Sequence, residues 1–140
     1  MQYLSNQLER FDLLDREWTL AHWTGDTLAV WVEGPEILTG EDAGQRPERA
    51  LVTFRGIEVL ETGTHVDQQD VKLTADEARE LFARETMFVF SYGIDGLDCD
   101  FCGLGSGTVL YMHFRFRSVT VEWDAFAGLS EPLVGELRKL

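Results

Sequence analysis

The sequence lacks both of the segments that would direct the chain into or through a membrane. No run of about 18 apolar residues occurs, so no membrane-spanning helix is expected. The first 20 residues do not combine a basic start with an apolar stretch, so no secretory signal peptide is expected either. These absences predict a cytoplasmic protein.

Positive charge is also scarce. The 140 residues include 12 Lys and Arg but 25 Asp and Glu, which gives a net charge of −13. Nucleic acids and anionic lipids are bound mainly through Lys and Arg, so neither is an expected partner. The acidic residues are concentrated in residues 1–100, whereas residues 101–140 are neutral overall. Evenly spread solvating charge would not leave residues 101–140 neutral. The excess of acid is explained either by a basic partner protein or by a need for solubility.

The remaining composition is typical of one globular domain. Apolar residues make up 44% of the chain and charged residues 26%. A chain of this length forms a single domain with its own core, so residues 1–140 are expected to fold as one unit. Residues 34–49 contain three glycines and two prolines without periodicity, which predicts a long loop.

A β-hairpin is predicted over residues 16–33. Residues 16–23 and 27–33 are rich in aromatic and β-branched side chains, and the sequence between them contains Gly25 and Asp26. A three-residue loop keeps the apolar side chains in register, whereas a two-residue loop mixes the two faces, so the first is preferred. In this register one face carries Trp18, Leu20, Leu28, Val30 and Val32, and the other carries Thr19, Ala21, Trp23, Ala29 and Trp31.

Further strands follow from alternation and from short apolar runs. In residues 108–116 the side chains of Leu110, Met112, Phe114 and Phe116 are predicted to face inward. The inward phase then changes to Val119, Val121 and Trp123, which either a hairpin at residues 117–118 or a bulge in one long strand would explain. The other predicted strands cover residues 50–54 and 57–60, separated by a bulge or tight bend at Gly56, and residues 86–92 and 94–102.

One helix is strongly indicated. Thr74 and Glu77 form a capping-box pattern, and the helix should run to about Arg84 and bury Ala78, Leu81 and Phe82. Residues 3–14 could form a short helix or a turn, and residues 130–132 open a short terminal helix. We therefore predict an α+β fold that is mainly antiparallel β. About seven or eight strands should form a curled sheet, either a sandwich or an open barrel, with the helix packed on it.

Three local motifs could bind a metal or phosphate, but each is better explained structurally. Cys99 and Cys102 lack the second ligand pair of a zinc site, and in a strand their thiols point to opposite faces, so two free thiols are expected. The glycine-rich segment 103–107 is followed by a strand rather than a helix, which indicates a hairpin turn. Asp95, Asp98 and Asp100 do not match a calcium loop.

The sequence gives no reason to expect a cofactor, a metal or a catalytic residue. His113 would lie opposite Glu122 if residues 117–118 formed the hairpin. Such a pair could act as an acid and a base, although a plain surface pair is the commoner case.

Aromatic and acidic residues together indicate a partner-binding surface. The chain has four Trp, nine Phe and three Tyr. In the preferred hairpin register, Trp23 and Trp31 lie on the less apolar face. We expect them to bind a basic protein together with Asp95, Asp98 and Asp100, because aromatic side chains anchor interfaces and carboxylates steer association.

Three segments resemble small bacterial immunity-type proteins, which are antitoxins. The segments are FDLLDREWTLAHWTGDTLAVWVEG (11–34), ALVTFRGIEVLE (50–61) and FRFRSVTVEWDAF (114–126). They carry a leading Phe-Asp, a hairpin with GD.L at its turn, an F.G strand and a closing pair of strands. Many of these proteins have His before the Asp, whereas this chain has Phe11 before Asp12, so no role of that histidine carries over.

The resemblance implies a non-enzymatic cytosolic protein that binds a toxin. The alternative is a β-domain that binds a small molecule or a metal in the mouth of the barrel, with or without enzymatic activity. A deep pocket with a histidine beside carboxylates would favour this alternative.

Overall fold

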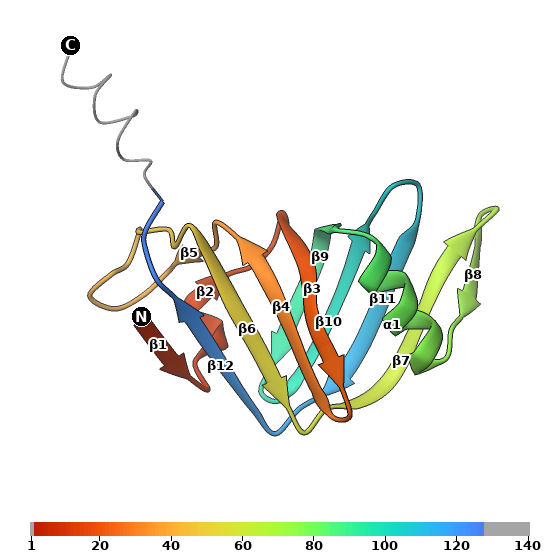
Figure 1. Ribbon diagram of the computed structural model, residues 1–140, viewed down its shortest axis with the longest axis horizontal. Coiled ribbons are helices and arrows are strands. Elements are labelled where there is room, and N and C mark those ends of the chain that lie inside the picture. Colours follow the sequence, from red (N-terminus) through yellow and green to blue (C-terminus); the bar gives the residue numbers. More distant parts are fainter. Residues whose placement is uncertain (1, 128–140) are drawn as a thin grey trace, which may run out of the picture.

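The computed structural model describes residues 2–127, which form a β-rich domain with one α-helix (Figure 1). No helix in this part of the chain is long and apolar enough to cross a membrane. The predicted helix at residues 130–132 lies outside the described residues. The strands are Gln2–Ser5 (β1), Phe11–Asp12 (β2), Arg16–Thr24 (β3), Thr27–Glu33 (β4), Glu36–Ile37 (β5), Arg49–Arg55 (β6), Glu58–Val66 (β7), Gln69–Lys72 (β8), Met87–Asp95 (β9), Asp98–Leu104 (β10), Val109–Arg115 (β11) and Ser118–Trp123 (β12), and the helices are Leu8–Arg10 (η1, a 3-10 helix) and Ala75–Arg84 (α1).

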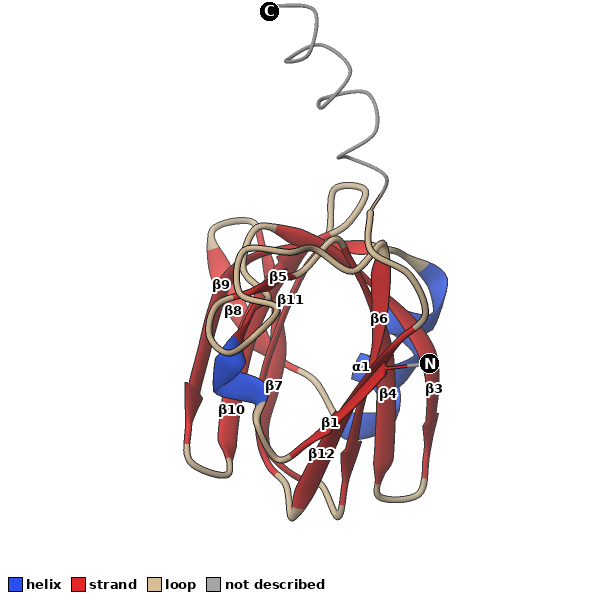
Figure 2. Cartoon of the chain, turned by 90° about the vertical axis from the view of Figure 1, so that its left-hand side faces the viewer, coloured by secondary structure: helices blue, strands red, loops and turns tan. Residues whose placement is uncertain are grey.

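Ten of the strands form one antiparallel sheet in the order β1-β12-β6-β4-β3-β9-β10-β11-β7-β8. The sheet curls so that two layers face each other (Figure 2), but its edge strands β1 and β8 do not pair, so it stays open. We call β1, β12, β6, β4 and β3 the front layer, and β9, β10, β11, β7 and β8 the rear layer. The prediction of a mainly antiparallel β-fold with one α-helix is confirmed. Seven or eight strands were expected, but the main sheet has ten, and β2 and β5 form a separate two-stranded sheet.

The helix fills the space where the two layers separate. Strands β3 and β9 pair only over Arg16–Trp18 and Met87–Val89, and α1 contacts β3, β7 and β11 beyond this short junction. As predicted, the Thr74 hydroxyl accepts a hydrogen bond from the Glu77 amide, and the Glu77 carboxylate accepts one from the Thr74 amide. The buried side chains of α1 are Ala78, Leu81 and Phe82, also as predicted.

Aromatic side chains join the two layers through the core. Phe54 of β6 meets Phe114 of β11 edge to face, with ring centroids 4.9 Å apart. The predicted inward faces of β11 and β12 are confirmed, because Leu110, Met112, Phe114, Phe116, Val119, Val121 and Trp123 are all buried.

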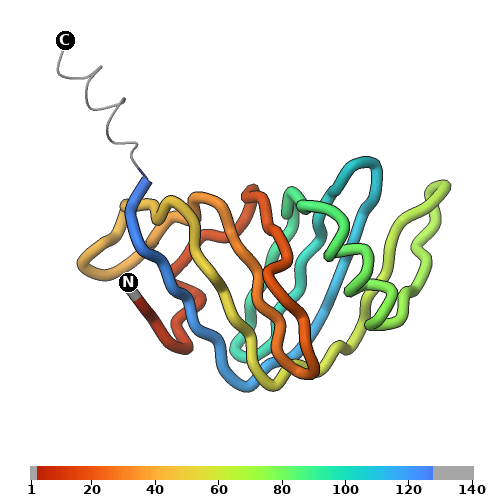
Figure 3. Tube along the Cα trace, in the orientation of Figure 1, coloured from red at the N-terminus to blue at the C-terminus, as the bar shows by residue number. Residues whose placement is uncertain are grey.

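The chain changes layer twice at the same end of the molecule (Figure 3). One change, from β6 to β7, is a tight bend at Gly56, whose φ of +69° favours glycine and confirms the predicted bend. The other, from β11 to β12, passes through Arg117, whose amide donates to the Arg55 carbonyl oxygen at 2.8 Å. The hairpin prediction for residues 117–118 is wrong, since β11 and β12 lie in opposite layers. The change of layer, rather than a hairpin or a bulge, explains the change of phase.

The N-terminal residues and the segment 34–49 cover one end of the core together. Residues 3–14 contain the short 3-10 helix η1, in line with the expected short helix or turn, and η1 lies between the strands β1 and β2. Strand β2 pairs with β5 at Phe11 and Ile37. The segment 34–49 is therefore not entirely a loop. Its Glu48 amide donates to the Ala125 carbonyl oxygen at 2.8 Å, which ties the segment to the chain just after β12.

Candidate partner-binding surface

The register of the β3–β4 hairpin separates the two tryptophans that were expected to lie together. The turn contains two residues, Gly25 and Asp26, because Thr24 pairs with Thr27. The predicted three-residue loop is therefore wrong. A bulge at Ala21 restores the apolar phase that a two-residue turn would otherwise disrupt.

The consequence is that Trp23 belongs to the core and Trp31 to the surface. Trp23 is only 6% exposed and lies beneath the Arg79 side chain of α1, whose Cζ is 5.2 Å from the ring centroid. Trp31 is half-buried on the outer face of β4. The structure therefore leaves Trp31, but not Trp23, available to a partner.

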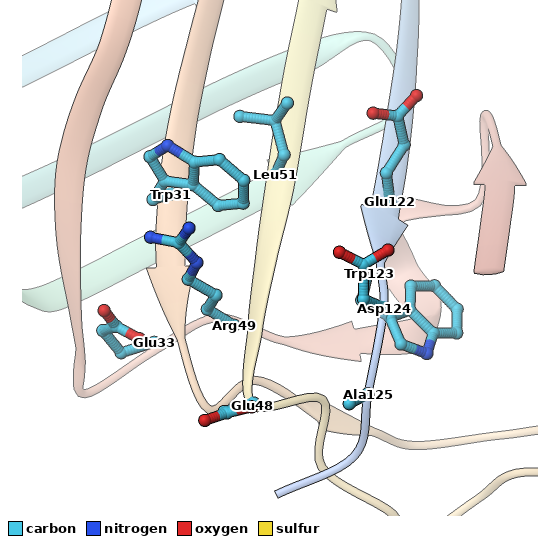
Figure 4. Close-up of a pocket in the computed structure, with 9 residues that line it drawn as sticks. All are labelled: Trp31, Glu33, Glu48, Arg49, Leu51, Glu122, Trp123, Asp124 and Ala125. Atoms are coloured by element: carbon cyan, nitrogen blue, oxygen red, sulfur yellow. The ribbon is translucent and has the colours of Figure 1, made fainter. Parts of the chain in front are cut away.

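Trp31 lies in a groove on the outer face of the front layer (Figure 4). Alternation directs Trp31, Leu51 and Glu122 outward, and the register aligns Trp31 with Leu51 and Leu51 with Glu122 across three neighbouring strands. The groove has a volume of about 510 Å³. We call it the Trp31 groove; its lining residues are Trp31, Glu33, Glu48, Arg49, Leu51, Glu122, Trp123, Asp124 and Ala125.

The groove carries a strong excess of negative charge. Four carboxylates line it, those of Glu33, Glu48, Glu122 and Asp124, against the single guanidinium of Arg49. This leaves a net charge of −3. Within residues 2–127 none of the four carboxylates forms an ion pair. Such a site can attract a cationic group from solution.

Arg49 itself stacks on Trp31. Its Cζ lies 3.9 Å from the centroid of the indole ring, a cation–π contact. Glu33 is the residue directly opposite Arg49 in the β4–β6 register, yet no ion pair joins the two among the described residues. Figure 4 shows the Arg49 side chain beside the Trp31 ring, with Glu33 and Glu48 further along the groove.

The three aspartates of the predicted surface lie on the outside of the other layer. Asp98 pairs in register with Asp95, and Asp100 with Gly93, on β10 and β9 of the rear layer. They line a shallow hollow of about 430 Å³, which His113 also borders. Asp98 is already bound to Arg115, with Nε 3.2 Å from Oδ1. The structure thus brings the three aspartates together but does not bring them near Trp31.

His113 has different neighbours from those that a hairpin would give. It lies opposite Asp100 on one side and opposite Glu61 on the other. Glu122 is in the front layer, between Tyr3 and Leu51. The expected pairing of His113 with Glu122 is therefore wrong, because it depended on the hairpin at residues 117–118.

The two cysteines point to opposite faces of β10, as their spacing predicts. Cys99 is buried in the core, whereas Cys102 is half-buried on the outer face. Burial, assisted by the charge of Asp100, raises the pKa of the Cys99 thiol far above its ordinary value of 9.0. Burial and the charge of Asp70 also raise the pKa of Cys102. In residues 2–127 no group of three His, Cys, Asp or Glu side chains is placed to hold a metal ion.

The glycine-rich segment forms the predicted hairpin turn between β10 and β11. The Gly105 amide donates to the Thr108 carbonyl oxygen at 2.7 Å. The Ser106 amide donates to the Glu85 carboxylate, also at 2.7 Å, so an internal side chain occupies this part of the loop.

Comparisons of the chain with protein-family models, curated proteins and solved structures found no match. The sequence did not indicate that Arg49, Leu51 or Glu122 belongs to a partner-binding surface. Alternation alone directs Leu51 and Glu122 outward, but only the position of β12 beside β6 makes them neighbours.

Proposed function

We propose that the protein is an acidic binding protein of the immunity type, which inhibits a basic toxin or a similar basic protein by binding it, without catalysis. The proposal places this activity in the cytoplasm. The observation that carries it is the Trp31 groove, where an accessible tryptophan lies among four carboxylates that have no ion-pair partner in the described chain.

The two components of the groove contribute differently to binding. A tryptophan on a rigid sheet supplies apolar area that a partner can cover at little entropic cost, and tryptophans are frequent among the residues that dominate interface energies. Carboxylates without partners attract a basic protein over several ångströms and increase the rate of productive encounters. The net charge of −13 extends the same attraction over the whole molecule.

The location of the groove favours docking over the alternative of a small-molecule or metal site in the mouth of the barrel. The hollows at Trp31 and at Asp100 both lie on outer faces of the layers. A third hollow, of about 490 Å³, lies at the end where the chain changes layer, and no histidine is among its lining residues. The space between the layers is filled by aromatic contacts such as Phe54 with Phe114. A partner protein can reach an outer face directly.

Site-specific photo-cross-linking in the native host tests this proposal. A photoreactive phenylalanine analogue is placed at position 31 and, as a matched control, at Phe90, an exposed aromatic residue of the rear layer. We expect position 31 to cross-link a basic protein that mass spectrometry identifies, and position 90 not to cross-link it.

The identified partner is then produced and its affinity is measured for the wild type, Trp31→Ala and Glu122→Gln. Glu41→Gln, at an exposed residue outside the groove, is the charge control. Weaker binding of the first two variants with unchanged binding of the control supports the proposal. Equal cross-linking from both positions, or full affinity of Trp31→Ala, would overturn it.

A further inference from the structure

The guanidinium of Arg49 lies on the indole of Trp31 although carboxylates are close by. The Cζ-to-centroid distance is 3.9 Å, and Arg49 is exposed to solvent without an ion pair to any described residue. A planar, weakly hydrated guanidinium stacks well on an aromatic face, which explains this position. The chain therefore shows, with its own side chain, which chemical group the Trp31 face accepts.

We propose that Arg49 is an internal occupant of a guanidinium-binding site, and that an arginine side chain of the partner displaces it from Trp31. This inference rests on the proposed function, for which it names the group that is recognised. It assigns to Arg49 the role of a residue that determines specificity by competing with the partner.

The charges of the groove make such an exchange favourable. Arg49 neutralises only part of the charge of the four carboxylates, so a second cation enters a groove with a net charge of −3. Glu33 faces Arg49 directly across the β4–β6 strand pair, so a displaced Arg49 has a carboxylate within reach. The incoming arginine meets Trp31 from the side of Glu122 and Asp124, which Figure 4 shows on the opposite wall of the groove.

The site should distinguish arginine from lysine. The ammonium group of lysine is compact and strongly hydrated, so stacking on an indole compensates poorly for its lost water. The carboxylates alone attract both side chains equally. A preference for arginine that depends on Trp31 therefore separates a stacking site from a merely acidic surface.

The probes are capped hexa-arginine and hexa-lysine peptides, whose affinities are measured by calorimetry with the whole chain. We expect the wild type to bind hexa-arginine about two- to fivefold more tightly than hexa-lysine, as cation–π energies at exposed sites imply. Trp31→Leu should abolish this difference. The chain has four tryptophans. The indole N–H signal that Trp31→Leu removes from the NMR spectrum should shift when hexa-arginine is added to the wild type.

Arg49→Ala tests the displacement, and Arg55→Ala is its matched control. Arg55 lies on the same strand and outer face, and its guanidinium donates to Thr120 rather than stacking on Trp31. Both substitutions remove one positive charge. Both variants should bind hexa-arginine more tightly than the wild type does. We expect the affinity of Arg49→Ala to be about threefold higher than that of Arg55→Ala, because only the loss of Arg49 uncovers the Trp31 ring.

Equal gains in the two variants, or an arginine preference that survives in Trp31→Leu, would overturn the inference. Failure of the proposed function has a different signature. If the peptides behave as expected but no basic partner is cross-linked from position 31, the guanidinium site stands and the immunity-type function fails. If a partner docks on Trp31 but Arg49→Ala matches Arg55→Ala, the function stands and the displacement fails.

Discussion

The ring of Tyr111 on β11 lies across Gly63 on the neighbouring strand β7. The two residues pair in register, and a Cβ added to Gly63 would fall 2.5 Å from Tyr111 Cζ. A side chain at position 63 would therefore meet the end of the Tyr111 ring, and backbone angles do not favour glycine there. The ring in turn covers backbone that a glycine leaves bare.

Replacing Gly63 with alanine should destabilise the protein by about 1 kcal/mol or less, because the end of the half-buried Tyr111 ring must move aside. Urea unfolding measures this loss. In a Tyr111→Ala background the same substitution should cost less, since no ring then opposes the new methyl group. Equal losses in both backgrounds would mean that the close approach of ring and strand is not what excludes a side chain.

The two tryptophans of the hairpin should respond very differently to truncation. Trp23→Ala opens a core cavity beneath α1 and should cost about 3–5 kcal/mol of unfolding free energy. Trp31→Ala removes a half-buried outer side chain and should cost about 1 kcal/mol or less. Denaturant titration of both variants checks this, and a large loss for Trp31→Ala would show that the residue is needed mainly for the fold.

Two triple substitutions of equal charge separate the two acidic surfaces. Changing Glu33, Glu122 and Asp124 of the groove to their amides should slow association with the basic partner by about tenfold at low salt. Changing Asp95, Asp98 and Asp100 to Asn removes the same charge from the opposite layer and should slow it much less. Stopped-flow kinetics at several salt concentrations measures both rates. If both triple substitutions slow association equally, the three aspartates also belong to the docking surface.

Stability should decrease in alkaline solution because of Cys99. Its thiol remains protonated in the folded protein, whereas in the unfolded chain it ionises near its ordinary pKa of 9.0. Above that pH the folded state binds more protons than the unfolded state, so each pH unit costs up to about 1.4 kcal/mol from this group until its raised pKa is reached. Below that pH the contribution is fully retained.

Urea unfolding of the wild type and of Cys99→Ala at a series of pH values from neutral to alkaline tests this expectation. The variant should show a shallower decline. Cys102→Ala, at the half-buried position of the same strand, should keep most of the wild-type decline. A decline that is identical in the wild type and Cys99→Ala would assign it to other groups.

The Tyr92 hydroxyl is buried without a hydrogen-bond partner among the described residues. Its ring packs edge to face on Trp18, with centroids 5.8 Å apart, and phenylalanine would retain that contact. Tyr92→Phe should therefore leave stability unchanged or increase it by about 1 kcal/mol, since an unpaired buried hydroxyl is costly. Thermal and urea unfolding measure the difference, and a clear loss of stability would show that the hydroxyl has a partner such as an ordered water.

The sequence predicts those parts of the fold whose signal is local. The apolar side chains of β11 and of β12 each recur with a period of two, and the capping box at Thr74 and Glu77 joins residues three apart. Both patterns could be interpreted without knowing the strand order. The bulge at Ala21 has no such signal, because neither glycine nor proline marks it.

The candidate site depended on information that no short segment contains. Trp31 was identified correctly as an aromatic residue outside the core, but Trp23 was not, because its face depends on the bulge. The pairing of Leu51 with Glu122 follows from the position of β12 between β1 and β6. Such non-local pairings are set by the packing of the whole sheet rather than by any local preference.

The position of β12 between β1 and β6 has a consequence for how the protein is made. During translation the first six strands emerge long before the strand that must be inserted among them. Until residues 118–123 leave the ribosome, the partner strand of β1 and of one edge of β6 is missing, so that edge of β6 is unpaired. A nascent chain on a ribosome that stalls before this point has an unpaired strand edge, which can pair with a strand of another chain. The front layer is therefore completed only when β12, the last described strand, pairs with β1 and β6.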